Sequence, residues 1–220
     1  GKIKLPQKGY PQAPIGWYVS EKYDGYRAIW NGQEFVSRNG NIFVTPQWFK
    51  DWFPNESLDG ELFMGRESFE KHGILRKKVA NDSEWKKAKV NFQIFDSPTI
   101  KGDFEERQLK IKKIIHLSCK KKGIGKCPLK YTKQTKISSE KQLYSMFDTL
   151  TNKGAEGVMI RSPHSPYEAK RSSHLLKVKQ LFDDECKIIG FQKGTGKYTN
   201  MLGAFECQMV KNPTIKFTIS

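Results

Sequence analysis

The sequence predicts an α+β protein in which antiparallel sheets flanked by helices are followed by the beginning of a small β-barrel. Three observations support this class. Apolar and polar residues alternate over residues 17–43, where two Asn-Gly pairs provide tight turns. Helical spacing of apolar residues appears in residues 66–79, 103–117 and 138–154. After residue 183 the sequence consists of short strand-like runs separated by Gly and Asn.

This change of sequence texture predicts a domain boundary near Asp183. We expect a first domain over residues 1–182 and a second over residues 183–220. The last residues read as a strand, so the second domain is expected to be incomplete. A chain of 220 residues can form one substantial core and part of a second domain.

The first domain is expected to open with one antiparallel meander and to continue with helices and strands. In the short helix expected after residue 44, Thr45 is a candidate N-cap and Pro46 suits the first helical position. The lysine-rich segment Lys120–Lys133 is expected to begin as a mobile loop. Further strands are predicted in residues 56–64, 90–97, 156–162 and 174–180.

The charge balance predicts an acidic partner. The formal net charge is +16, from 39 Lys and Arg against 23 Asp and Glu. Such a charge attracts polyanions, of which nucleic acid is the commonest, and a solvated basic surface is the alternative. No apolar run is long enough to span a membrane, so no membrane partner is expected.

The four cysteines contain no CxxC pair. Reduced thiols in an intracellular protein are therefore expected, rather than a zinc site, and an oxidising compartment is the alternative. The N-terminal residues contain no apolar signal segment, so a signal is either absent or already removed. A cytoplasmic, nuclear or viral location is favoured over a periplasmic one.

Lys22 is the first candidate for chemistry. It stands in the stretch KYDGYR, before Asp24, Gly25 and Arg27. A lysine attacks phosphorus only as the neutral amine, so a nucleophilic role requires burial or cationic neighbours that lower its pKa. Taken alone, the stretch fits a hairpin turn with exposed charges better.

Charged side chains on other predicted strands are further candidates. Asp59 and Glu61 are two residues apart and share a strand face, and Glu156 begins another strand. For either carboxylate taken alone a hydrogen bond or salt bridge at the strand end is favoured, with a magnesium ion on a phosphate substrate as the alternative. Lys177 and Lys179 also share a face, which a surface strand exposed to water tolerates and a buried groove tolerates only with an anion between them.

Taken together and in order, these stretches resemble the motifs of the ATP-dependent DNA ligases, within the covalent nucleotidyltransferase superfamily. KYDGYR is similar to the KxDGxR nucleophile motif of that family. SRNG, LDGEL, FQIFD, EGVMIR and LLKVK resemble its further motifs in the same order. The resemblance runs from about Trp17 to the end of the chain and is closest to the minimal ligases of bacteria and viruses. It implies an adenylation domain followed by an OB-fold domain.

The resemblance also implies a reaction. ATP would transfer AMP to Lys22, AMP would pass to the 5′-phosphate of nicked duplex DNA, and the 3′-hydroxyl would then displace it. The enzyme would act as a monomer with Mg²⁺ or Mn²⁺. The implied roles are adenine stacking for Phe95, the ribose or adjacent groups for Arg38 and Glu61, the sugar or nick end for Arg27, the metal for Glu156 and Glu61, the α-phosphate for Lys177 and Lys179, and the nick 5′-phosphate for Arg171.

One departure and two alternatives accompany the resemblance. The last motif of the family, a basic segment that orients pyrophosphate, should follow FTIS and is missing from the sequence, which implies truncation or weak self-adenylylation. An RNA ligase or an mRNA-capping guanylyltransferase would share the fold and the lysine. A catalytically silent nucleic-acid-binding module is the second alternative. Lys120–Lys133 is either a DNA contact or a disordered loop.

Overall fold

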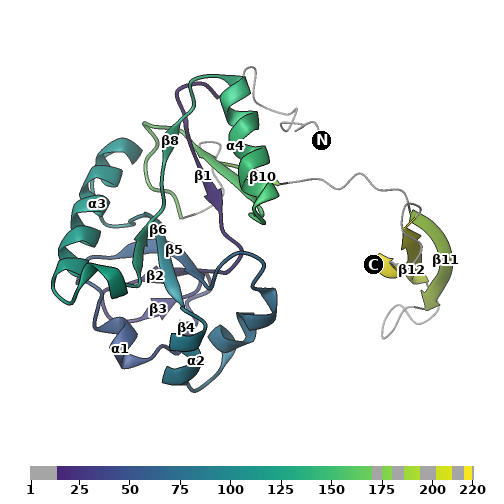
Figure 1. The fold of residues 1–220 in the computed structure, drawn as a ribbon, viewed down its shortest axis with the longest axis horizontal. Coiled ribbons are helices and arrows are strands. Elements are labelled where there is room, and N and C mark those ends of the chain that lie inside the picture. The colour runs from purple at the N-terminus through teal and green to yellow at the C-terminus, as the bar shows by residue number, and fades with distance from the viewer. Residues whose placement is uncertain (1–13, 170–174, 180–185, 194–201, 210–215, 220) are drawn as a thin grey trace. The chain divides into compact units, whose positions relative to one another are not determined.

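The computed structural model describes residues 14–169, 175–179, 186–193, 202–209 and 216–219 (Figure 1). The chain divides into two compact units, residues 1–180 and residues 181–220, and each is considered by itself. The boundary predicted near Asp183 lies outside the described residues. None of the helices in the described part of the chain is long and apolar enough to cross a membrane.

The larger sheet of the first unit has six strands in the order β4-β3-β2-β5-β6-β7. Neighbouring strands are antiparallel except β6 and β7, which are parallel. Both predicted Asn-Gly turns are confirmed, because Gly32 and Gly40 have φ angles of 97° and 80°, in the region that glycine favours. The strands are β2 (Tyr26–Trp30), β3 (Phe35–Val36), β4 (Ile42–Phe43), β5 (Leu58–Phe63), β6 (Asn91–Asp96) and β7 (Leu129–Tyr131).

A second sheet of four strands has the order β10-β9-β1-β8. Its strands are β1 (Tyr18–Lys22), β8 (Thr135–Lys136), β9 (Gly157–Arg161) and β10 (Leu175–Lys179). The single meander expected over residues 17–43 is therefore wrong, since β1 and β2 belong to different sheets. Alternation of apolar and polar residues marks the face of a strand but does not identify its partner. Residues 23–25 form a crossing between two sheets and not a hairpin.

Two long helices follow the predicted periodicity. They are α3 (Phe104–Lys120), with Asp103 as N-cap, and α4 (Glu140–Asn152), with Ser139 as N-cap. In each case the cap side chain accepts a hydrogen bond from the backbone N–H three residues later. Figure 1 shows α4 beside β1 and β8, and its Leu143 and Phe147 pack into the apolar core of the smaller sheet.

Two helical predictions need correction. Thr45 does not cap α1 (Gln47–Lys50), because its hydroxyl donates to the carbonyl of Phe43 and the N-cap is Pro46. The segment expected to be an α-helix over residues 66–79 is a 3₁₀ helix, η1 (Phe69–Arg76), whose buried residues His72 and Leu75 are three apart, the repeat of that helix.

Alpha-helix α2 (Asp82–Lys87) was not predicted. It is short, begins after the N-cap Asn81 and buries Trp85 in the core of the larger sheet. Six residues are too few for the recurring apolar pattern from which a helix is predicted.

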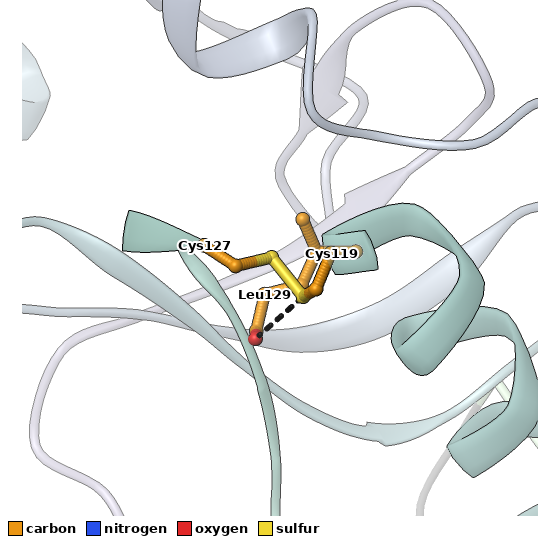
Figure 2. The surroundings of a disulfide bond; sticks show 3 residues. All are labelled: Cys119, Cys127 and Leu129. Atoms are coloured by element: carbon orange, nitrogen blue, oxygen red, sulfur yellow. Dashed lines mark hydrogen bonds between the residues drawn. A yellow bond between two sulfur atoms is a disulfide. The ribbon is translucent and has the colours of Figure 1, made fainter. Parts of the chain in front are cut away.

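Cys119 and Cys127 form a disulfide, which corrects the expectation of reduced thiols for this pair (Figure 2). Both cysteines are buried, and the Sγ of Cys119 lies 3.8 Å from the carbonyl oxygen of Leu129. The disulfide closes the first part of the Lys120–Lys133 segment, which contains the 3₁₀ turn η2 (Ile124–Lys126). It ties the end of α3 to the residues that precede β7.

The second unit contains three antiparallel strands in the order β11-β12-β13. They are β11 (Cys186–Lys193), β12 (Leu202–Met209) and β13 (Lys216–Ile219). The β11–β12 pairing has an irregularity between Ile188 and Gly190. The short strands agree with the sequence pattern after residue 183.

Candidate active site

A cavity of about 210 Å³ is lined by residues from both sheets of the first unit. The cavity lies next to the crossing between β1 and β2. The chain therefore changes from one sheet to the other at the cavity wall. The cavity brings together five of the predicted site residues, together with Ser20. These six residues are Ser20, Lys22, Arg27, Glu61, Phe95 and Lys177.

Strand register explains why residues far apart in the sequence line one wall. Ser20 in β1 lies opposite Met159 in β9, and Met159 lies opposite Lys177 in β10. Residues opposite one another in neighbouring strands direct their side chains to the same face. All three line the cavity. A second row aligns Lys22 with Gly157 and Lys179, of which Lys179 is described for its backbone alone.

Lys22 is held by a carboxylate. Its Nζ donates a hydrogen bond to Oε1 of Glu156 at 2.7 Å, and the two side chains are 17% and 29% exposed. Lys22 ends β1 and Glu156 precedes β9, so the antiparallel pairing of the two strands places them together. The ammonium is thus oriented at the cavity wall and still reaches solvent.

Glu61 carries the most strongly altered carboxyl group of the cavity. It lies in β5 opposite Arg27 of β2. Burial raises its pKa from 4.5 to about 7, while the charge of Lys22 and a hydrogen bond from the N–H of Gly25 act in the opposite direction. This carboxyl group therefore changes its charge near neutral pH, next to the lysine.

Two glycines permit close contact between backbones at this site. A Cβ atom on Gly25 would collide with the carbonyl oxygen of Leu62, and one on Gly60 would collide with the carbonyl oxygen of Gln93. The crossing that follows Lys22 therefore lies directly against β5, and β5 lies close to β6. The glycines of KYDGYR and LDGEL are required by this packing.

Asp59 does not share the cavity with Glu61. It is fully buried and accepts two hydrogen bonds from Arg27, at 3.2 and 2.7 Å, and one from the hydroxyl of Tyr167 at 2.7 Å. Asp59 thereby fixes the guanidinium of Arg27, which lies 5.7 Å from the ring centroid of Phe95. Asp59 and Glu61 both lie beside Arg27, but Glu61 lines the cavity whereas Asp59 forms the salt bridge that was the alternative expected for these carboxylates.

Arg38 is not among the described residues that line the cavity. Arg38 lines a smaller hollow of about 90 Å³, together with Arg27 and Tyr167. Arg27 lines both spaces, so it connects the region of Lys22 to that of Arg38. Arg171 lies outside the described residues.

Sequence reasoning missed several cavity residues, among them Gln134 and Arg161. Arg161 is 3.6 Å from Asp96, which also forms a fully buried ion pair with Arg107 at 2.7 Å. These residues come from β6, α3 and β9, and only the folded chain brings them together. Asp96 and Arg161 end the stretches FQIFD and EGVMIR, but neither stretch indicates that the two residues pair with each other.

The carboxylates present suit a magnesium ion that binds together with a phosphate. The described residues contain no group of three or more His, Cys, Asp and Glu that could hold a metal by themselves. Lys22 interacts with both carboxylates, since its charge lowers the pKa of Glu61 and its Nζ donates a hydrogen bond to Glu156. Mg²⁺ commonly binds through one or two carboxylates, with substrate phosphates and water completing its shell.

Comparisons with known proteins identify the family of the chain. Residues 11–179 match the sequence profile of the ATP dependent DNA ligase domain. The chain is 36% identical to a DNA ligase of Haemophilus influenzae over 203 residues, which are 90% of this chain and 71% of that protein. It is also 36% identical to a DNA ligase of Archaeoglobus fulgidus over 80 residues, 36% of this chain and 14% of that protein.

Solved structures show the same likeness. The structure of a Lig E DNA ligase has a TM-score of 0.81 and 29% sequence identity, over 94% of this chain and 77% of that one. The Chlorella virus DNA ligase-adenylate shares the fold, with a TM-score of 0.62 and 20% identity over 94% of this chain and 78% of that one. The resemblance to this family is confirmed, and the chain belongs to the ATP-dependent DNA ligases.

Proposed function

We propose that this ligase uses Lys22 as its nucleophile and seals 5′-phosphate/3′-hydroxyl nicks in duplex DNA through a lysyl-AMP intermediate. One observation carries this proposal. Lys22, the last residue of β1, lines a cavity that Glu61, Phe95 and Lys177 also line, and Glu156 orients its amine.

The first step forms a bond between Nζ of Lys22 and the α-phosphorus of ATP. The bond from that phosphorus to the bridging oxygen breaks, and pyrophosphate leaves with the electron pair. The amine must lose a proton to attack, and Glu156 is within hydrogen-bond distance to receive it, at 2.7 Å. Lys177 would stabilise the negative charge that develops on the phosphoryl oxygens.

The same cavity offers groups for the rest of the nucleotide. Phe95 provides a ring on which adenine can stack. Glu61 would accept a hydrogen bond from the ribose. Lys179 would contact the α-phosphate beside Lys177, since its backbone is in register with Lys22.

Mg²⁺ or Mn²⁺ is the metal that we propose for this site, with Glu61 and Glu156 as its protein ligands. When bound, the ion would neutralise charge on the phosphates. The chain itself contributes the nucleophile, the surrounding lysines and the orientation of the nucleotide.

The second and third steps act on DNA. The 5′-phosphate of the nick would attack the lysyl-AMP, which releases Lys22, and the 3′-hydroxyl would then form the phosphodiester bond and release AMP. Arg171 would contact the nick 5′-phosphate and Arg27 the sugar or nick end, while Arg38, which lines a hollow together with Arg27, would hold the ribose or adjacent groups. The net charge of +16 supports attraction to the duplex.

Three further features belong to this proposal. We infer that the second unit belongs to an OB-fold domain, which its three antiparallel strands support. The enzyme is expected to act as a monomer. The disulfide between Cys119 and Cys127 favours an oxidising compartment, such as the periplasm, over the intracellular location expected from the cysteine pattern.

A nick-sealing assay tests the function. The wild type should join a nicked DNA duplex with a 5′-phosphate in the presence of ATP and Mg²⁺, and should not join the matching RNA nick. Lys22→Ala should not seal this nick but should still seal one that is already adenylylated. Lys113→Ala, an exposed lysine of α3, is the matched control and should behave as the wild type.

The outcomes separate the parts of the proposal. Sealing of the 5′-phosphate nick by Lys22→Ala would remove the lysine from the mechanism. Joining of the RNA nick but not of the DNA nick would overturn the proposal that DNA is the substrate. If the wild type seals only the adenylylated nick, the proposed site stands and the defect lies in self-adenylylation.

A further inference from the structure

Phe95, which lines the nucleotide cavity, lies at an irregular point of β6. Asp59 of β5 lies opposite Asp96 of β6. The next residue, Gly60, lies opposite Ile94, so Phe95 has no residue of β5 opposite it. The pairing of β6 with β7 also ends at Ile94. An extra residue of this kind bends its strand and redirects a side chain, and such irregularities are common beside active sites.

Helix α3 holds the backbone of Phe95 at this point. The side-chain amide of Gln108 donates from Nε2 to the carbonyl oxygen of Phe95 at 2.7 Å. The preceding residue of α3, Arg107, donates from Nε to Oδ1 of Asp96 at 2.7 Å. Two consecutive residues of the helix therefore hold two consecutive residues of β6, where its pairing with β5 is interrupted.

Gln108 is itself fixed in one orientation. It is buried, and its Oε1 accepts a hydrogen bond from the hydroxyl of Tyr131 at 3.0 Å. A backbone carbonyl can only accept, so the amide must direct its Nε2 toward Phe95 and its Oε1 toward Tyr131. Burial raises the pKa of Tyr131 to about 12, so the hydroxyl keeps the proton that it donates.

The link between Gln108 and the cavity is the backbone of Phe95. Gln108 is not among the described residues that line the cavity, and its two hydrogen bonds go to Phe95 and Tyr131. Gln108 therefore does not touch the nucleotide, and its influence on the nucleotide passes through Phe95.

We propose that Gln108 is a positioning residue, which holds the irregular end of β6 so that Phe95 presents its ring to the base of the nucleotide. Without the amide, the carbonyl of Phe95 loses its donor, and the backbone can turn and take the ring with it. A displaced ring overlaps less with the base, so ATP binds more weakly while the attack by Lys22 changes little. This inference rests on the proposed function, because it uses the stacking proposed for Phe95.

The test compares the wild type with Gln108→Met, which has a side chain of similar length but makes neither hydrogen bond. Calorimetry measures the affinity for α,β-methylene-ATP, an analogue that cannot transfer AMP, after bound AMP has been removed with pyrophosphate. Gln108→Met should bind the analogue about 3- to 10-fold more weakly, the range for one buried hydrogen bond. In the formation of lysyl-AMP from ATP the loss should appear in KM, with kcat changed by less than about 2-fold.

A second substitution separates positioning from general destabilisation. Phe95→Leu removes the ring and should itself weaken binding about 10-fold. In this background Gln108→Met should cost less than about 2-fold, because no ring is left to position. Thr45→Val is the matched control. It removes another buried hydrogen bond to a backbone carbonyl, that of Phe43, and should not change the affinity in either background.

Tyr131→Phe is an independent variant in case Gln108→Met does not fold. It leaves the amide of Gln108 in place and removes the donor to its Oε1. It should weaken binding about 2- to 3-fold when the ring of Phe95 is present, and should have no measurable effect in Phe95→Leu. Circular dichroism establishes that each variant is folded.

The outcomes distinguish this inference from the proposed function. Unchanged affinity in folded Gln108→Met, or the same loss with and without the ring of Phe95, would overturn the role of Gln108. Wild-type affinity in Phe95→Leu would also overturn it, since there would be no stacking to support. A wild type that binds the analogue but forms no lysyl-AMP would count against the proposed function, and the binding comparison would still decide the role of Gln108.

Discussion

The carboxyl group of Glu61 should contribute less to the free energy of unfolding at neutral pH than in acid. Its pKa is raised from 4.5 to about 7, with burial as the largest cause. As pH rises, the unfolded chain releases this proton before the folded chain does. The stabilisation of the folded state by protonated Glu61 is therefore fully present below about pH 4.5 and is lost as pH rises through about 7.

The magnitude follows from the two pKa values. The difference between 4.5 and about 7 corresponds to roughly 3.4 kcal/mol once the group is ionised in both states. The coupling between protonation and folding gives a loss in the free energy of unfolding of roughly 0.8 kcal/mol by pH 5 and roughly 3.3 kcal/mol by pH 8. Glu61→Gln keeps the shape of the side chain and has no charge to bury, so it should escape this loss.

Urea unfolding of both proteins at pH 5 and pH 8 measures the effect. Relative to the wild type, Glu61→Gln should gain about 2.5 kcal/mol in free energy of unfolding between the two conditions. The same variant should adenylylate Lys22 more slowly, since the carboxylate is proposed to bind the nucleotide and metal. Glu56→Gln, in an exposed loop, is the control. A stability difference that does not change with pH would refute the reasoning.

Two further predictions concern the frame around the cavity. Replacing Cys119 and Cys127 by serine removes a cross-link with a sequence separation of 8 and should lower the free energy of unfolding by about 2.5 kcal/mol, by the entropy of loop closure. Urea unfolding with and without reductant measures this difference, and equal stability of the two proteins would contradict the prediction. Asp96→Asn removes the counter-charge of the fully buried Arg107 and of Arg161, and should lower the free energy of unfolding by roughly 3 kcal/mol or more. A loss below about 1 kcal/mol, the range of surface pairs, would show that Asp96 does not hold these arginines.

The sequence was most informative where local chemistry determines structure. Helix α3 (Phe104–Lys120) and helix α4 (Glu140–Asn152) have regular apolar spacing and side-chain caps, so both were predicted. The turns at Gly32 and Gly40 were predicted because their Asn-Gly pairs suit left-handed backbone. Short elements such as α2 (Asp82–Lys87) have too few residues to show a period.

Strand pairing could not be predicted in the same way. The break between β1 and β2 turns one expected meander into two sheets, and this break creates the cavity beside Lys22. The order of the motifs indicated which residues act together, but not that Asp59 would be buried against Arg27 while Glu61 faces the cavity. Gln134 belongs to no motif, and only the folded chain shows that it lines the cavity.

The most direct test of the account is the intact mass of the protein after incubation with ATP and Mg²⁺. The protein is first treated with pyrophosphate to remove any AMP acquired during expression, and GTP is used in a parallel sample. The account predicts a gain of one AMP from ATP alone, located on Lys22 by peptide mapping, and no gain in Lys22→Ala. AMP attached to another residue, or an unchanged gain in Lys22→Ala, would contradict the claim that Lys22 is the nucleophile.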